Sequence, residues 1–326
     1  MELPRALITG ISGFVGSHLA ELLLAETDCQ VAGTVLGDMS NVAHLRERLT
    51  LYPAELSRLD VVAYILEEVR PDFIFHLAAQ PIPSLSARDP WSTLEPNIRM
   101  QLNILEAVVR LKLNSRVLVV GSSEEYGLVS PDQLPITEDT PLRPLNPYAV
   151  SKIAQDFLGL QYHLAHGVFA VRVRPFNHIG PRQRLGFVAP DLARQVAEAE
   201  AGLQPPVVYV GNLDVYRDFS DVRDVVRAYW LALTKGEPGS VYNIGSGQVH
   251  SIREMLERLI ALTGKQIEIR IDPQRTRPSE VPRLVADASR FRQRTGWEPR
   301  IPFEQSLRDV LDEWRARVRS STQVQG

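Results

Sequence analysis

The feature that most constrains the fold is a glycine-rich turn near the start of the chain, LITGISGFVG. It follows residues 6–9, an apolar run typical of a short strand, and it opens a segment with apolar residues at helical spacing. Gly10 permits a tight turn, Gly13 lets the backbone approach a pyrophosphate, and Gly16 lets the helix pack closely on the strand. This order of strand, glycines and helix predicts a dinucleotide-binding turn, with the phosphates at the helix N-terminus, rather than a plain glycine turn.

Short apolar runs alternate with segments of helical periodicity through the first half of the chain. This alternation is typical of a doubly wound parallel sheet with right-handed crossovers, so we expect an α/β fold of the Rossmann type. The expected strands are residues 6–9, 30–35, 73–76, 116–120 and 168–174, and the expected helices are residues 14–25, 61–69, 98–111 and 148–166.

The regular alternation stops at Pro175, where a loop rich in Pro, Gly, Asn and Arg begins. A helix over 189–201 and a short strand over 207–210 come next, and a helix over 222–233 and a strand over 241–244 then return to the first pattern. We therefore expect two discontinuous domains. Residues 1–175 with about 218–247 form the dinucleotide-binding domain, and about 176–217 with 248–326 form a smaller α/β lobe.

Charge and cysteine content exclude several classes of partner. The 326 residues include 36 basic and 39 acidic side chains, a formal charge of −3, so we expect neither nucleic acid nor a membrane surface as a partner. Cys29 is the only cysteine, which excludes an internal disulfide and a cysteine-rich metal site and suits a reducing compartment. The N-terminus enters the first strand without a basic leader or a long apolar run. We expect a cytoplasmic protein that binds no metal.

Tyr148 and Lys152 form a YxxxK pair that lies one helical turn apart, so both side chains share a face. A phenol is a poor acid or base at neutral pH, and we expect the nearby ammonium to lower the pKa of Tyr148. Tyr148 can then donate or accept a proton. Such pairs also occur by chance in many helices, but the glycine turn and Ser122 upstream favour the catalytic interpretation.

The sequence GSSEEYG directly follows the strand expected at 116–120, so its side chains emerge at the carboxyl edge of the sheet. There Ser122 can hydrogen-bond a substrate oxygen and Glu124 can exchange a proton. The alternative is that one or both glutamates face solvent, which we expect of Glu125.

The choice of cofactor depends on the loop after the second strand, VAGTVLGD. It holds neither an arginine for a 2′-phosphate nor a clearly placed acid for a ribose hydroxyl, so NAD and NADP both stay open. Asp38 equally fits a solvated turn. Asp60, placed before a helix, either accepts a hydrogen bond from the adenine or caps that helix. His76 closes the strand FIFH and is interpreted as a satisfied core histidine rather than a ligand.

The backbone that follows His76 is expected to line the cofactor groove together with the glycine turn. The predicted cofactor residues from these segments are Gly10, Ser12, Gly13, Phe14, Val15, Gly16, Asp60, Leu77, Ala78 and Ala79.

Polar residues of the second half are candidates for binding a diphosphate. Arg217 in YRDF and Arg277 in RTRPSEVP offer the fork of donors that matches phosphate oxygens, although spacing alone also fits surface arginines. Asn177 in PFNHIGP could donate its amide to the same phosphates or hold the loop. We expect His178 beside it to stabilise the loop.

The order TGxxGxxG, HLAA, SSxxxYG, YxxxK, RxFNxxGP, RDF and RPxE resembles the extended short-chain dehydrogenase/reductases that act on nucleotide sugars, over nearly the whole chain. The resemblance implies a homodimer formed through the helices at 98–111 and 148–166, and NADP or NAD as cofactor. The implied site residues are Ser122, Tyr148 and Lys152 for catalysis, Tyr148, Lys152 and Asn97 (before the helix NILEAVV) near the cofactor, Asn177, Arg217 and Arg277 at the diphosphate, and Glu280 at the nucleotide ribose.

Within this family, FNHIGP, RPSEVP and TGWEPRIPFEQSL look most like GDP-6-deoxy-4-keto-D-mannose reductases, which make GDP-D-rhamnose. This implies a GDP-linked deoxyhexose as substrate. The GDP-mannose 4,6-dehydratases are close, but they show TGxxGQDG, an arginine-rich cofactor loop and NHESPRR where this chain has TGISGFVG, VLGD and NHIGPRQ. Glu124 keeps the dehydratase alternative open, because it matches the base that takes the C5 proton there.

Other members of the family fit less well. A GDP-fucose synthase uses a cysteine and a histidine in the catalytic region, where this chain has serines, and a non-catalytic dinucleotide sensor would lack Tyr148 and Lys152.

Overall fold

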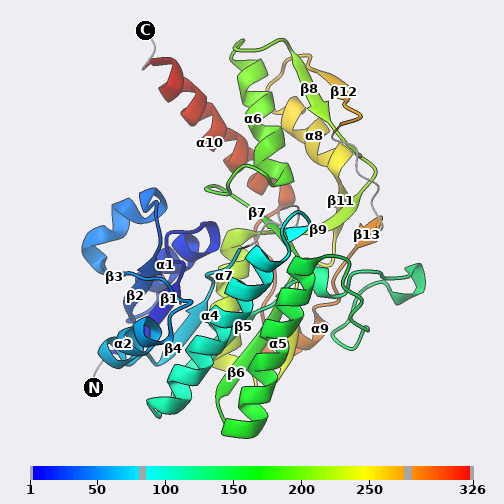
Figure 1. Cartoon of the computed structure of the whole chain (residues 1–326). Coiled ribbons are helices and arrows are strands. Elements are labelled where there is room, and N and C mark those ends of the chain that lie inside the picture. Colours follow the sequence, from blue (N-terminus) through cyan, green and yellow to red (C-terminus); the bar gives the residue numbers. More distant parts are fainter. Residues whose placement is uncertain (1–2, 81–85, 275–280, 324–326) are drawn as a thin grey trace.

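A parallel sheet forms the larger part of the molecule (Figure 1). The computed structural model describes residues 3–80, 86–274 and 281–323. The strands of this sheet are β1 (Arg5–Thr9), β2 (Gln30–Val35), β3 (Leu49–Pro53), β4 (Phe73–His76), β5 (Arg116–Val120), β6 (Phe169–Pro175) and β10 (Val241–Ile244). Their order is β10-β6-β5-β4-β1-β2-β3, with parallel pairing throughout. The strand order reverses between β1 and β4, so a ligand crevice is expected at their carboxyl ends.

Helices cover both faces of the sheet. On one face α1 (Phe14–Glu26) packs beside α7 (Val222–Lys235), and on the other lie α2 (Leu59–Val69), α4 (Trp91–Arg110) and α5 (Pro147–His166). Alternate strand residues serve the two cores, because successive side chains of a strand point to opposite faces. Ile8 and Leu118 pack under α1 and α7, whereas Leu7 and Val117 pack under the other helices.

The structure confirms the predicted α/β class and most of the predicted elements. The strands at 30–35, 73–76, 116–120, 207–210 and 241–244 have the predicted bounds. β3 was not predicted, and neither was the short helix η1 (Ser40–Arg48) that precedes it. α4 begins at Trp91, seven residues before the predicted start, because it runs through Pro96, a residue that usually ends a helix.

A smaller lobe lies beyond the carboxyl edge of the sheet (Figure 1). β9 (Tyr216–Asp221) is its central strand and pairs with β7 (Asn177–Ile179), β11 (Val249–Ser251) and β13 (Arg283–Leu284), while β8 (Val207–Val210) pairs with β12 (Glu268–Ile271). Three helices share its apolar core: α6 (Val188–Glu200), α8 (Ile252–Ala261) and α10 (Phe303–Gln323). The segment around α9 (Ser289–Thr295) returns to the large sheet, where Phe291 and Trp297 join the core under α7.

Asp221 is a junction between the two parts of the molecule. It ends β9, and its side chain accepts a hydrogen bond from the Arg223 backbone N–H at 2.8 Å, which caps α7. The Ser306 hydroxyl of α10 donates to the other carboxylate oxygen at 2.6 Å. One buried carboxylate thus holds a strand of the small lobe, a helix of the large sheet and the C-terminal helix.

Arg182 forms a second junction. Its backbone has a positive φ of 71°, its N–H donates to Glu313 of α10 at 2.8 Å, and its guanidinium donates to Glu21 of α1 at 2.6 Å. The same guanidinium lies 2.6 Å from His18 Nδ1. Burial and the charge of Arg182 lower the pKa of His18 to about 4, so this imidazole is neutral near pH 7.

No helix in the described ranges is long and apolar enough to cross a membrane. The described residues also contain no cluster of three or more histidine, cysteine, aspartate or glutamate side chains that could hold a metal ion.

Candidate active site

The glycine turn has the shape that a dinucleotide needs. Gly10 has a φ of 67°, and a Cβ at this position would lie 3.1 Å from the backbone of Ala78. A Cβ on Gly16 would overlap the Gly10 carbonyl oxygen, so only glycine lets α1 approach the turn this closely. Gly13 is the N-cap residue of α1, with no side-chain cap among the described residues. The first-turn N–H groups of α1 are therefore free to bind a phosphate, and the residues present fit a dinucleotide.

Thr9 anchors the strand end that faces this turn. Its buried hydroxyl oxygen accepts hydrogen bonds from the N–H groups of Leu77 and Ala78, at 3.0 and 3.1 Å. The hydroxyl hydrogen is then donated to His76 Nδ1 at 2.8 Å, which places the imidazole hydrogen on Nε2. Thr9 thus fixes the backbone that was predicted to line the cofactor groove.

His76 only partly matches its interpretation as a satisfied core histidine. The side chain is buried, and burial together with the charge of Lys152 lowers its pKa to about 3. Nδ1 is bonded to Thr9, but Nε2 has no partner among the described residues. His76 is therefore a neutral core histidine with one unsatisfied donor.

The loop after β2 is held by its own polar residues. Asp38 accepts hydrogen bonds from the backbone N–H and hydroxyl of Ser40 at 2.9 and 2.7 Å, as in a solvated turn. Asn41 donates to the Ser12 carbonyl at 3.0 Å and so ties this loop to the glycine turn. Asp60 does not precede the next helix as predicted. It lies in the first turn of α2, exposed and paired with Arg58 at 2.6 Å, because the helix starts two residues earlier than expected.

Tyr148, Lys152 and Ser122 come together at the carboxyl end of β5. The Ser122 side chain acts on the Tyr148 phenol and opposes the rise of its pKa, and Lys152 Nζ lies 5.9 Å from the centre of the Tyr148 ring. Lys152 is buried and donates to the Val120 carbonyl at 2.9 Å. Burial lowers the pKa of Lys152 to about 8, against the opposing effect of the Glu125 carboxylate.

The prediction that Lys152 lowers the pKa of Tyr148 is wrong. Burial and the nearby carboxylate of Glu124 raise the pKa of Tyr148, and the Ser122 side chain only partly opposes them. The main physical reason is burial of the phenol, while the Lys152 ammonium donates to the Val120 carbonyl and lies 5.9 Å from the centre of the Tyr148 ring. Tyr148 therefore holds its proton at neutral pH and is suited to donate it.

Asn97 does not lie before a helix as predicted, because α4 starts earlier and includes it. It is fully buried, accepts from the Gln80 N–H at 2.7 Å and donates to Ser151 Oγ at 3.0 Å. Ser151 in turn donates to the Tyr148 carbonyl at 2.7 Å. Asn97 thus connects the chain after β4 with the first turn of the helix that carries Tyr148.

Glu124 faces the junction with the small lobe. Its carboxylate accepts from Asn146 at 3.1 Å, and Asn146 also caps the helix of Tyr148 by accepting from the Ala149 N–H at 2.8 Å. Burial lowers the pKa of Arg217, on β9, and the Glu124 carboxylate opposes this shift. The two side chains therefore act on each other across the boundary between the large sheet and the small lobe.

The small lobe brings some of the predicted substrate residues to the same boundary. Asn177 lies on β7 and Arg217 on the adjoining β9, where Arg217 donates to the Tyr216 carbonyl at 2.8 Å. Arg277 and Glu280 lie outside the described residues. His178 stabilises this region as expected, because its ring stacks on Phe14 of the glycine turn, 5.9 Å between centres.

The expectation that Glu125 faces solvent is wrong. Its side chain is fully buried, and its carboxylate accepts from the Ser122 N–H at 2.8 Å while lying 3.0 Å from Arg174 of β6. The sequence held one signal for this placement. Ser and Glu three residues apart form a capping box, which turns the glutamate back toward the chain.

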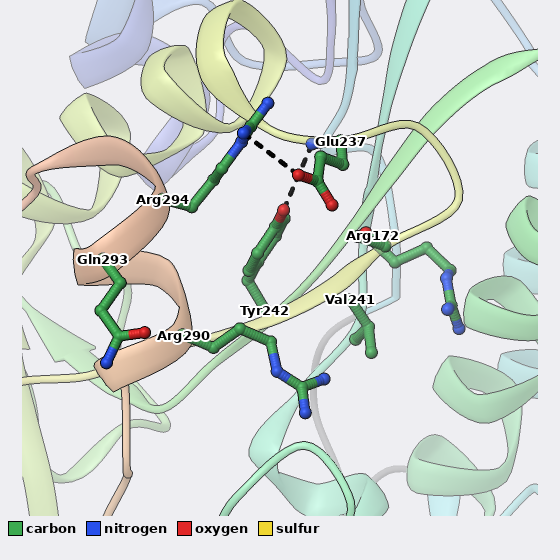
Figure 2. Close-up of a pocket in the computed structure, with 8 residues that line it drawn as sticks. Arg172, Glu237, Val241, Tyr242, Arg290, Gln293 and Arg294 are labelled. Carbon is green, nitrogen blue, oxygen red and sulfur yellow. Dashed lines mark hydrogen bonds and ion pairs between the residues drawn. The ribbon is translucent and has the colours of Figure 1, made fainter.

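A cavity of about 440 Å³ lies elsewhere, near the start of β10 (Figure 2). Figure 2 shows the guanidinium groups of Arg172, Arg290 and Arg294 well apart, with no shared point toward which all three are directed. Each is already paired, with Asp156, Asp139 and Glu237 respectively. None of the residues that line this cavity belongs to the Tyr148 site, so the two are separate. Because its arginines are paired elsewhere, the lining offers no convergent set of donors for one anion.

A parallel sheet in this order, with a glycine turn before α1 and a tyrosine-lysine pair beside a serine, defines a nicotinamide-dependent oxidoreductase of the Rossmann type. The chain belongs to the extended short-chain dehydrogenase/reductase family of NAD(P)-dependent enzymes that act on nucleotide sugars. The family model that matches, GDP-mannose 4,6 dehydratase, covers residues 7–310.

Individual relatives match over almost the full length. GDP-6-deoxy-D-mannose reductase of Pseudomonas aeruginosa is 40% identical over 97% of this chain and 98% of its own length. The structure of RMD from Pseudomonas aeruginosa complexed with NADPH has 38% identity and a TM-score of 0.85, covering 96% of this chain and 99% of that one. UDP-glucose 4-epimerase of Thermus thermophilus, in complex with NAD, has 30% identity and a TM-score of 0.85, covering 95% and 99%.

Proposed function

We propose that this protein uses a reduced nicotinamide cofactor to reduce the C4 keto group of GDP-4-keto-6-deoxy-D-mannose, forming GDP-D-rhamnose. The observation that carries the proposal is the Tyr148 phenol, which has a raised pKa and lies with Lys152 and Ser122 at the sheet edge that also holds the glycine turn. A keto group that receives hydride needs a proton on its oxygen, and a phenol with a raised pKa supplies one. The 40% identity to GDP-6-deoxy-D-mannose reductase supports the choice of substrate.

In this proposal the glycine turn and the backbone after β4 hold the dinucleotide. Gly13 and the first turn of α1 would receive the pyrophosphate, and Lys152 and Asn97 would lie near the nicotinamide end. The cofactor supplies the hydride. The loop after β2 carries no arginine in its VLGD segment, whereas the matched Pseudomonas aeruginosa structure holds NADPH, so the assay compares NADH with NADPH. The residues predicted to surround the dinucleotide are Gly10, Ser12, Gly13, Phe14, Val15, Gly16, Asp60, Leu77, Ala78, Ala79, Asn97, Tyr148 and Lys152.

The chain's own groups then place and protonate the substrate oxygen. Tyr148 donates its phenolic proton to the oxygen on C4 as that oxygen gains negative charge. Ser122 orients the same oxygen, and the Lys152 ammonium stabilises the phenolate that remains. Arg217 and Asn177 bind the diphosphate from the small lobe. Arg277 and Glu280 complete this set on the evidence of the sequence alone.

The decisive assay supplies GDP-4-keto-6-deoxymannose with NADH or NADPH and follows absorbance at the reduced nicotinamide band. We expect consumption of one reductant per substrate and its loss in Tyr148→Phe. Absence of any consumption with either cofactor by the folded protein would exclude the reductase function. If Tyr148→Phe left every measured activity and function unchanged, we would interpret the protein as a non-catalytic dinucleotide sensor instead of an enzyme.

A second function, 4,6-dehydration of GDP-mannose, is favoured by one observation. Glu124 is a partly exposed carboxylate beside Ser122, coupled to Arg217 of the small lobe. In this second function Glu124 is the base that takes the C5 proton, and a reductase does not need such a base. Conversion of GDP-mannose to its 4-keto product without added reductant, and loss of that reaction in Glu124→Gln, would establish the dehydratase or a bifunctional enzyme. Another epimerase or dehydratase of the family would reveal itself by acting on a different nucleotide sugar.

We also propose a homodimer formed through α4 and α5, which lie side by side (Figure 1). Three apolar residues of α5 are exposed at heptad spacing, namely Val150, Phe157 and Leu164, with Leu164 74% exposed. A second copy of the same helix pair would cover this stripe. Residues 1–175 with about 218–247 are proposed to bind the dinucleotide, and about 176–217 with 248–326 to bind the nucleotide sugar, in a cytoplasmic enzyme.

A further inference from the structure

Glu125 is the one carboxylate of the catalytic loop that is fully buried, and local sequence explains how it gets there. Ser122 begins the short helix η2 (Ser123–Glu125), and Glu125 closes a capping box by accepting the Ser122 N–H at 2.8 Å. A Cβ on Gly121 would overlap the same Glu125 oxygen, so glycine is needed to leave room for it. The backbone position of Ser122 therefore depends on the side chain of Glu125.

Glu125 also ends a buried row of charges that lies between α5 and β6. Its second oxygen lies 3.0 Å from Arg174 Nε, and the same nitrogen donates to Asp156 at 2.8 Å. Asp156 accepts from Arg172 at 2.5 Å. All four side chains are less than a tenth exposed. With both carboxylates ionised the row has two negative and two positive charges, and a proton on Glu125 leaves it with a net positive charge.

The charge of Glu125 reaches the catalytic side chains. Its carboxylate raises the pKa of Lys152 and contributes to the raised pKa of Tyr148. Burial raises the pKa of Glu125 itself to about 8, with a further contribution from Asp156 and an opposing one from Arg174. The titratable and charged groups that act on Glu125 or feel its charge are Tyr126 on its own loop, Tyr148, Lys152 and Asp156 on α5, and Arg174 on β6.

We propose that Glu125 is a positioning residue of the Ser122, Tyr148 and Lys152 site, holding the Ser122 backbone with one oxygen and supporting the Lys152 ammonium with its charge. The kinetic consequences of this inference rest on the proposed function. The contacts of Glu125 that support it do not depend on that function. Burial raises the pKa of Glu125 to about 8, and the pKa of Lys152, also about 8, already includes the raising effect of the Glu125 carboxylate. The charge of Glu125 raises the pKa of Lys152, so the ammonium persists to higher pH than it would without that charge.

Two substitutions separate the two roles. Glu125→Gln keeps an oxygen for the Ser122 N–H but removes the charge, so the alkaline limb of the kcat/KM profile moves to lower pH by about one unit. Glu125→Asp keeps the charge but shortens the side chain, so kcat falls about tenfold or more at neutral pH with a smaller change in KM, while the limb stays near its wild-type position. Glu138→Gln is the matched control, since Glu138 is also buried, has a raised pKa and accepts a backbone N–H, from Asn243 at 2.8 Å.

The same variants are tested by NADPH binding as a function of pH, followed by fluorescence. This measurement does not require turnover, so it judges Glu125 even if the reductase assay fails. We expect the loss of affinity at alkaline pH to occur at lower pH in Glu125→Gln and not in Glu138→Gln. The proposal would be overturned if Glu125→Gln left both the alkaline limb of the kcat/KM profile and the alkaline loss of NADPH affinity at their wild-type pH. So would a fall in melting temperature as the sole effect of both Glu125 variants, because that would assign Glu125 a purely structural role.

Discussion

Thr9→Val is the most informative single change for the cofactor site, because it removes one hydroxyl and leaves the shape of the side chain nearly intact. In the wild type this hydroxyl accepts from the Leu77 and Ala78 N–H groups and donates to His76 Nδ1. All three partners would lose their hydrogen bond at a position where Thr9 is 1% exposed.

The expected loss of stability follows from the number of partners. A buried polar group left without a hydrogen bond costs about 1–3 kcal/mol, so Thr9→Val should lower the free energy of unfolding by about 3 kcal/mol or more. Thr34 is the matched control, because it is paired with Thr9 across β1 and β2, is 3% exposed and, among the described residues, accepts only the Gly10 N–H through its hydroxyl, at 3.2 Å. Thr34→Val should cost about 1 kcal/mol.

Urea unfolding of both variants at pH 7 measures this difference, and an NADPH titration measures its effect on the site. We expect Thr9→Val to bind NADPH more weakly than Thr34→Val, because Leu77 and Ala78 lose their anchor. Equal losses of stability in the two variants, within about 0.5 kcal/mol, would refute the reasoning that Thr9 is a three-way anchor.

Other consequences of the structure can be measured independently. Gly16→Ala forces a methyl group onto the backbone of the preceding turn and should cost about 1–3 kcal/mol in thermal unfolding. Gly13→Ala, whose Cβ would lie 3.1 Å from that backbone, should cost less stability but weaken NADPH binding in a titration. The pKa of His18 is about 4 in the fold against 6.5 unfolded, so the unfolded chain binds more protons between these values and acidification from pH 6.5 to 4 removes stability, by up to about 1.4 kcal/mol per pH unit. Urea unfolding at pH 7 and 5 should show a smaller decrease for His18→Gln, and an unchanged decrease would contradict this assignment. Phe157→Asp should shift the protein toward a monomer in sedimentation experiments, whereas Leu203→Asp, at an exposed apolar residue of the small lobe, should not.

The large sheet was predictable because its strands are short apolar runs separated by turn residues, and this information is local. The bounds of β2, β4 and β5 follow directly from their sequences. β3 is an edge strand, LTLYP, that pairs with β2 alone in the described part of the chain and has a mixed burial pattern, so its sequence lacks the apolar signal of a central strand. The predicted start of α4 came too late. Pro96 lies inside the real helix, where tertiary packing outweighs the local preference against proline.

The spatial grouping of three candidate site residues was predictable, and their electrostatics were not. Ser122, Tyr148 and Lys152 meet as the motifs indicated. The raised pKa of Tyr148 depends on its burial and on the nearby Glu124, and the buried Glu125 is paired with Arg174 from strand β6. Both are set by long-range packing, which a motif does not encode.

The position of Asp221 affects how this molecule unfolds and which of its parts relatives could exchange by recombination. The last residue of a small-lobe strand is the cap of a helix that covers the large sheet, and no linker separates the two. A cut on either side of Asp221 would leave α7 without its cap and the C-terminal helix without its Ser306 anchor. We therefore expect one cooperative unfolding transition, and we expect recombination between relatives to exchange surface loops more readily than whole lobes.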